Sequence, residues 1–115
     1  MLPQSHLAVI ARNVAWTGPG EVATEPHEVG WAKEAVIFVR LLKPAAWPHG
    51  PHPLAVEISP DGMHWAPHGT TIALPKDETE MTVARVTHFG GWLRVAGPMH
   101  DGESITVLVS LHLKA

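Results

Sequence analysis

The pattern of apolar and polar residues is clearest near the end of the chain. From residue 104 to residue 114 every second residue is polar, with the exception of Leu108. The positions between them hold aliphatic side chains, at Ile105, Val107, Val109, Leu111 and Leu113. A period of two places these side chains on one face of a β-strand. The pattern therefore predicts a strand over residues 104–114 whose outward face carries one apolar residue.

A second segment predicts a β-hairpin in the middle of the chain. Residues 54–58 place larger apolar side chains at alternate positions, Leu54, Val56 and Ile58, and the sequence Ser-Pro-Asp-Gly follows at 59–62. Proline presets φ at the second position of a type I turn, and glycine suits the fourth. We therefore expect Val56 and Ile58 to point into a core, Glu57 to point outward, and the chain to return through residues 63–65.

The remaining segments continue the same all-β pattern. Glycine and proline recur at intervals of about ten residues, and no stretch shows an apolar helical stripe bounded by caps. Further strands are predicted at residues 7–14, 21–29 with a break at Pro26, 31–42, 81–88 and 92–96. In the last of these Leu93 and Val95 face inward, Arg94 faces outward, and the Gly-Pro pair at 97–98 ends the strand. About eight strands in a single domain, residues 1–115, predict an antiparallel β-sandwich of the jelly-roll kind.

Two of these segments also resemble a known family. Residues 56–65 (VEISPDGMHW) resemble the central hairpin of discoidin-like, galactose-binding-like β-sandwich domains. Residues 89–95 (FGGWLRV) resemble the later strand of those domains, in which an aromatic residue precedes Leu-Arg-Val. Both segments also resemble small jelly-roll modules of phage and phage-like particles. The chain lacks the terminal cysteines usual in discoidin domains, and the resemblance therefore implies a β-sandwich rather than a particular ligand.

Composition points to self-association. Charged residues make up 17% of the chain, whereas ordinary soluble domains have ~25%. Because a small domain needs more polar cover than a large one, part of the surface is expected to be buried against other copies of the chain. A surface covered by the 11 prolines, 10 glycines and nine histidines is the alternative. The candidate interface residues are Phe38 in the apolar run 35–39, Trp47 in a proline-rich loop, Leu108 and His112.

Charge and hydropathy argue against two classes of partner. The net charge is −3, and the eight lysines and arginines are scattered rather than arranged as the basic stripe of a nucleic-acid-binding protein. No window approaches the ~18 apolar residues that cross a bilayer, and the first residues do not form a secretory signal pattern. We therefore expect no nucleic acid partner, no membrane insertion, and a location in the cytoplasm or in a particle assembled there.

The histidines and potential nucleophiles do not predict a catalytic site. The pairs His49/His52 and His64/His68 have spacings that two ligands of one metal ion can have, but the proline inside each pair indicates a loop without fixed geometry. We interpret these histidines as solvated or interface residues and predict no metal and no cofactor. No Gly-x-Ser-x-Gly sequence or phosphate-binding loop is present, so no catalytic residue is assigned.

Trp47 leaves three interpretations open. An aromatic ring beside polar donors can stack on a sugar ring, anchor a neighbouring subunit, or pack locally. The leading hypothesis is a non-enzymatic structural subunit that forms a homo-oligomer, as a trimer or within a larger shell-like or phage-like particle. One alternative is a carbohydrate-binding module whose glycan ligand contacts Trp47, His49, His52 and Arg94. Another is a small metal-dependent enzyme with histidine ligands.

Overall fold

The computed structural model describes residues 5–115, which form strands and loops. Within this range no helix is long and apolar enough to cross a membrane. The nine strands are β1 (Ser5–Thr17), β2 (Gly20–Ala23), β3 (His27–Glu28), β4 (Glu34–Leu41), β5 (Pro53–Ser59), β6 (Ala66–Ala73), β7 (Met81–Thr87), β8 (Trp92–Met99) and β9 (Ser104–Lys114).

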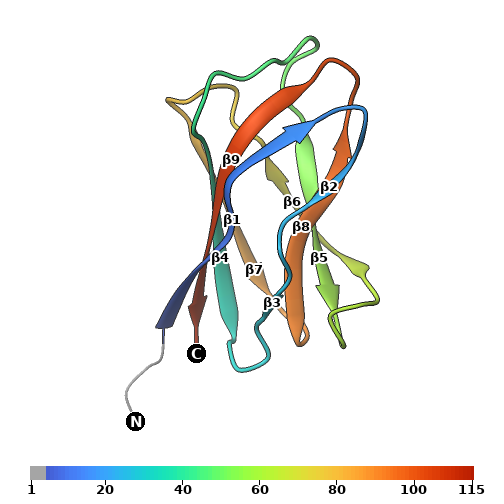
Figure 1. Ribbon diagram of the computed structural model, residues 1–115. Helices are drawn as coiled ribbons and strands as arrows, with labels where there is room; N and C mark the ends of the chain where they lie inside the picture. The colour runs from blue at the N-terminus through green and yellow to red at the C-terminus, as the bar shows by residue number, and fades with distance from the viewer. Residues whose placement is uncertain (1–4) are drawn as a thin grey trace.

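The strands form two antiparallel sheets that pack face to face (Figure 1). Sheet A has the order β1-β9-β4-β7, and sheet B has the order β2-β8-β5-β6, with β3 also paired to β8. The two short strands β2 and β3 flank Pro26 and together occupy one edge of sheet B, as the predicted break at that proline implies. Counted this way, each sheet has four strand positions and the chain passes repeatedly from one sheet to the other. The predicted jelly-roll β-sandwich is therefore confirmed.

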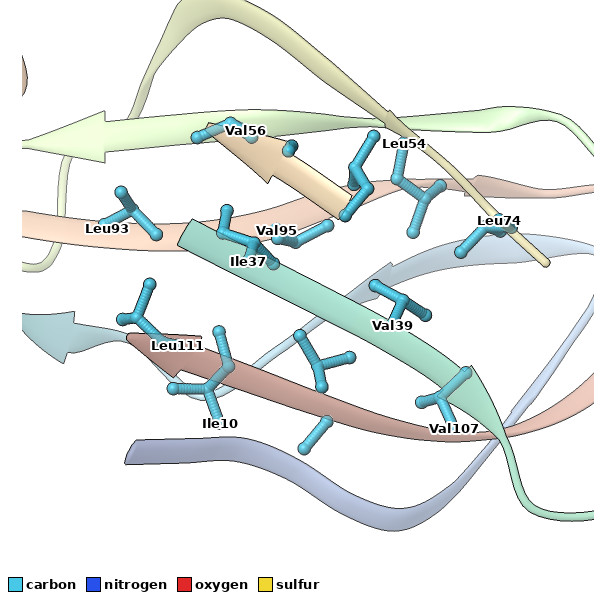
Figure 2. Close-up of a cluster of buried hydrophobic side chains, with 14 of the residues drawn as sticks. Ile10, Ile37, Val39, Leu54, Val56, Leu74, Leu93, Val95, Val107 and Leu111 are labelled. Atoms are coloured by element: carbon cyan, nitrogen blue, oxygen red, sulfur yellow. The ribbon is translucent and has the colours of Figure 1, made fainter. Parts of the chain in front are cut away.

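The core lies between the two sheets (Figure 2). The aliphatic residues of β9 are buried as their alternation predicts, and Leu108 lies half-buried on the opposite face. From β4 the inward side chains are Ala35, Ile37, Val39 and Leu41, and from β8 they include Leu93 and Val95. Trp16 is also buried, near the end of β1, which places one of the five tryptophans in the core.

The predicted hairpin joins β5 to β6, but its loop is longer than expected. Val56 is fully buried, and Ile58 lies half-buried at the rim of the core opposite Leu93. The Ser59 hydroxyl accepts hydrogen bonds from the amides of Asp61 and Gly62, which stabilises the turn. The chain then continues through residues 63–65 before β6 begins, so the return strand starts later than predicted.

The prediction that Gly97 and Pro98 end their strand is wrong. Strand β8 continues through both residues to Met99. Strand β5 pairs with β8 only as far as Ala96, so Pro98 has a neighbouring strand on one side alone, where it lies opposite Glu21 of β2. A proline is tolerated there because no hydrogen bond is required from it on the unpaired side.

Four loops meet at one end of the sandwich, which we call the loop end (Figure 1). They are the β1–β2, β4–β5, β6–β7 and β8–β9 loops. Ala46 of the β4–β5 loop forms a β-bridge with Ser104 at the start of β9. The Gly18 amide donates a hydrogen bond to the Glu103 carbonyl at 3.0 Å, which ties the β1–β2 loop to the β8–β9 loop. Segments far apart in the sequence are therefore held side by side at this end.

Candidate functional site

The loop end contains a cluster of three potential ligand side chains, His52, His100 and Glu103, which we call the His-His-Glu cluster. His52 ends the β4–β5 loop, and the other two residues lie in the β8–β9 loop. Strands β4 and β9 are neighbours in sheet A, and the Ala46–Ser104 bridge continues that contact into the loops. One donor atom from each side chain lies within 4.8 Å of the others, so the cluster can hold a small cation.

Glu103 is the buried member of the cluster. Its side chain is only 4% exposed, and its Oε1 accepts a hydrogen bond from the His100 amide at 2.6 Å. The same oxygen lies 2.8 Å from Nε2 of His52. The Glu103 amide in turn donates to the His100 carbonyl at 3.1 Å, which closes the β8–β9 turn. The carboxylate is thus held in place by groups from two loops.

The electrostatic environment keeps this carboxylate ionised. Burial alone would raise the pKa of Glu103. The hydrogen bonds from the His100 amide and the His52 ring, together with the nearby imidazoles, outweigh burial and bring the pKa below its usual value. The cluster therefore offers a negative oxygen ligand beside two imidazoles at neutral pH.

Trp47 forms one wall of the cluster. Its ring meets the His52 ring edge-on, with the centroids 5.5 Å apart, and its Nε1 donates a hydrogen bond to the Pro75 carbonyl at 3.1 Å. The ring is half-buried and packs against the core. The indole N–H is thus bonded within the chain, and the ring packs beside His52.

Of the four residues considered as a ligand-binding set, the structure places three near one another and Arg94 apart from them. Trp47 and His52 are in contact, and His49 lies exposed in the turn between them. Arg94 lies on the outer face of sheet B, where it forms an ion pair with Glu57 at 2.8 Å and stacks over the Trp65 ring at 4.3 Å. Arg94 lies five positions along the extended strand from Met99, where β8 ends, a span of ~17 Å. Arg94 therefore lies far from the loop end.

The residues considered for an interface gather on the outer face of sheet A, apart from Trp47. Phe38 and His112 contact each other edge-on with ring centroids 5.0 Å apart. The strand register places Val9, Ser110, Phe38 and Val83 in one row across the sheet. The flanking rows are Leu7, His112, Val36 and Arg85 on one side, and Arg12, Leu108, Arg40 and Met81 on the other.

This outer face combines exposed apolar side chains with positive charge. Leu7, Met81 and Val83 are 56%, 54% and 42% exposed, although they are large and hydrophobic. The three arginines of the flanking rows form no ion pair with any residue in the range 5–115. The face thus mixes apolar side chains with three arginines, and the arginines lie in the two flanking rows.

Sequence reasoning missed two members of the His-His-Glu cluster. His100 and Glu103 lie 48 and 51 residues from His52, so no local spacing links them. The signal that could have found them is topological, because this strand order places the β8–β9 loop, before the last strand, beside the β4–β5 loop. Of the histidine pairs examined by spacing, His49/His52 contributes only His52 to the cluster. The other pair lies elsewhere: His64 bonds Asp61, and His68 bonds Thr70 and the Thr87 carbonyl.

The fold and its loops define the class of protein, a jelly-roll β-sandwich, and comparison with known proteins supports that class alone. No protein-family model matches the chain, and no curated protein matches it. Among solved structures, the PBSX exported protein XepA superposes with a TM-score of 0.65 at 9% identity. The match covers 94% of this chain but 36% of XepA, so the chain spans about a third of that protein's length.

Two smaller proteins match over most of their length. The Yersinia pseudotuberculosis-derived mitogen YPM has a TM-score of 0.53 at 12% identity, over 99% of this chain and 87% of that one. A chain of the Bacillus endospore appendages, described as a novel family of disulfide-linked pili, has a TM-score of 0.50 at 10% identity, over 96% of this chain and 87% of that one. At these identities the likeness shows a shared fold.

Proposed function

We propose that this chain is a non-enzymatic structural subunit that self-associates through the outer face of sheet A. The observation that carries the proposal is the row in which Val9, Phe38 and Val83 lie with Ser110 on that face, where no other element within residues 5–115 covers them. Contiguous exposed apolar surface on a small domain favours association, since covering it removes apolar area from water.

Charge complementarity favours a second copy of the same chain as the occupant. The outer face of sheet A carries Arg12, Arg40 and Arg85, whereas the β6–β7 loop carries Asp77, Glu78 and Glu80 with a single lysine. A contact between the basic face of one copy and the acidic loop end of the next joins two different surfaces. Such a contact closes into a ring, such as a trimer, or continues as a filament.

Two of the structural neighbours support the proposed structural role. One structural neighbour is the PBSX exported protein XepA, and another belongs to endospore appendages described as pili. The low content of charged residues, 17%, is the composition expected of a subunit that covers part of its surface with its neighbours. The proposed setting is therefore an assembled particle or appendage.

The proposal is tested by measuring absolute mass with light scattering behind a sizing column. Wild type is expected to be oligomeric at micromolar concentration, and Val83→Glu is expected to shift it toward monomer because it places a charge at the β7 end of the row of apolar residues. The matched control is Thr71→Glu, which adds the same charge at an exposed position of β6 in sheet B. A monomeric wild type, or a Val83→Glu variant as large as wild type, would overturn the proposal.

A further inference from the structure

We propose that His52, His100 and Glu103 form a binding site for a divalent transition metal ion of the zinc type. Two imidazole nitrogens and one carboxylate oxygen converge within 4.8 Å, and they come from two loops that the fold holds together. Imidazole nitrogen with a carboxylate is a donor set that zinc accepts, and three protein ligands leave a fourth position for water.

The hydrogen-bonding pattern of His52 supports this assignment. Its Nδ1 lies 3.2 Å from the Pro53 carbonyl, and its Nε2 lies 2.8 Å from Oε1 of Glu103. Both ring nitrogens therefore face oxygen acceptors, although a neutral imidazole has only one N–H to donate. A metal ion at Nε2 satisfies both contacts, because Nδ1 then donates to the carbonyl while Nε2 and Oε1 both bind the ion. Metal-bound histidines commonly donate their second ring nitrogen to a backbone carbonyl in this way.

The distances require only a small adjustment to admit the ion. Zinc bonds to nitrogen and oxygen are about 2.0–2.2 Å long, which places neighbouring ligand atoms of a tetrahedral site ~3.3 Å apart. Nε2 of His52 and Oε1 of Glu103 lie 2.8 Å apart and would separate by roughly half an ångström. His100 has an exposed side chain beside the His52 ring, with centroids 4.7 Å apart, so it can rotate toward the ion.

The surroundings hold two of the three ligands firmly. Glu103 is buried and bonded to the His100 amide, and Trp47 packs edge-on against His52. Gly102 has a φ of +82°, and a Cβ there would lie 3.1 Å from Pro48 of the β4–β5 loop. Glycine at this position therefore lets the β8–β9 turn approach the loop that carries His52. Preorganised ligands of this kind raise metal affinity because less conformational entropy is lost on binding.

The direct test is calorimetric titration of chelator-treated protein with ZnCl2, with CoCl2 as a spectroscopic probe. Saturable binding of one ion per chain is expected, with visible Co²⁺ absorption bands typical of tetrahedral coordination. His100→Ala and Glu103→Gln are each expected to weaken zinc binding by at least ~tenfold. His100 is exposed, so its truncation leaves the core intact, and circular dichroism checks the fold of both variants.

The matched control is His64→Ala, which removes the histidine of an exposed histidine–carboxylate pair in the β5–β6 loop. It is expected to bind zinc as wild type does. Absence of saturable binding, or an equal loss in His64→Ala and His100→Ala, would overturn the site. Val83→Glu separates this proposal from self-association: it is expected to bind one zinc ion with unchanged affinity, and loss of zinc binding in that variant would contradict a site contained within one chain.

Discussion

The molecule contains two histidine–carboxylate pairs with the same chemistry and opposite surroundings. His64 and Asp61 lie three residues apart in the β5–β6 loop, and their side chains are 81% and 39% exposed. His52 and Glu103 lie 51 residues apart at the loop end, and their side chains are 18% and 4% exposed. The first pair closes its own loop, whereas the second connects two loops and leaves donor atoms converging on one point.

The two carboxylates are also kept ionised by different means. The pKa of Asp61 is lowered mainly by hydrogen bonds from the His64 amide and ring and from the Met63 amide, all within its own loop. Glu103 must first overcome burial, which raises its pKa, before the bonds from His100 and His52 lower it. The contacts of Glu103 must offset the cost of burying a carboxylate, and they join two loops of the fold. Removing them should therefore lower the stability of the whole domain.

The largest expected difference between the pairs is in stability. Glu103→Ala removes the buried carboxylate that accepts from the His100 amide and from His52, and should lower the free energy of unfolding by about 2 kcal/mol, or roughly 8 °C in melting temperature. Chemical denaturation in the presence of chelator measures the effect without any contribution from metal. Asp61→Ala is the matched comparison, and its loss should be smaller because water replaces the lost hydrogen bonds. An equal or larger loss in Asp61→Ala would contradict the distinction drawn between the two pairs.

The difference between the pairs also shows what the sequence can predict. Strand β9 was predictable because its burial follows a local period of two, and the β5–β6 hairpin was predictable because its turn residues are adjacent in sequence. The Asp61–His64 contact belongs to the same class, since the turn itself brings the two side chains together. Local rules suffice wherever the partners lie within one hairpin.

Local sequence rules could not predict the His-His-Glu cluster. Its members meet because β4 and β9 are neighbours in sheet A, a relation that depends on the complete order of strands. The continuation of β8 through Pro98 was missed for a similar reason, because it depends on where β5 stops pairing. Neither the cluster nor the continuation of β8 can be predicted from the residues next to it in sequence.

The two loops also differ in how they use tryptophan, which gives a prediction of intermediate size. Trp47→Phe keeps an aromatic ring beside His52 but removes the donor to the Pro75 carbonyl, and should cost about 1 kcal/mol. Trp65 lies in the β5–β6 loop under Arg94, and Trp65→Phe keeps a ring face for that cation, so a smaller loss is expected. Thermal melts of both variants with chelator present make the comparison. A greater loss of stability in Trp65→Phe than in Trp47→Phe would show that the loop end is less tightly fixed than the β5–β6 loop.

The smallest expected effect concerns acid and is measured at the exposed pair. Because the pKa of Asp61 is lowered in the folded state, its contribution to stability is complete above the ordinary aspartate value of about 4 and is lost as the pH falls through the lower native value. The Met63 and His64 amides donate to Asp61 at 2.8 and 2.9 Å, so their hydrogen exchange should stay slow through mild acid. These two amides should lose their protection only at strongly acidic pH.

Asp61→Asn separates this local effect from acid unfolding of the whole domain. The asparagine oxygen still accepts from the two amides but carries no charge, so their protection should be weaker at neutral pH and should not change further as acid is added. The amides of buried β9 residues serve as the internal reference, because their exchange reports opening of the core. If the wild-type Met63 and His64 amides lose protection only together with those of β9, the exposed pair does not stabilise its loop independently, and the local role assigned to it is wrong.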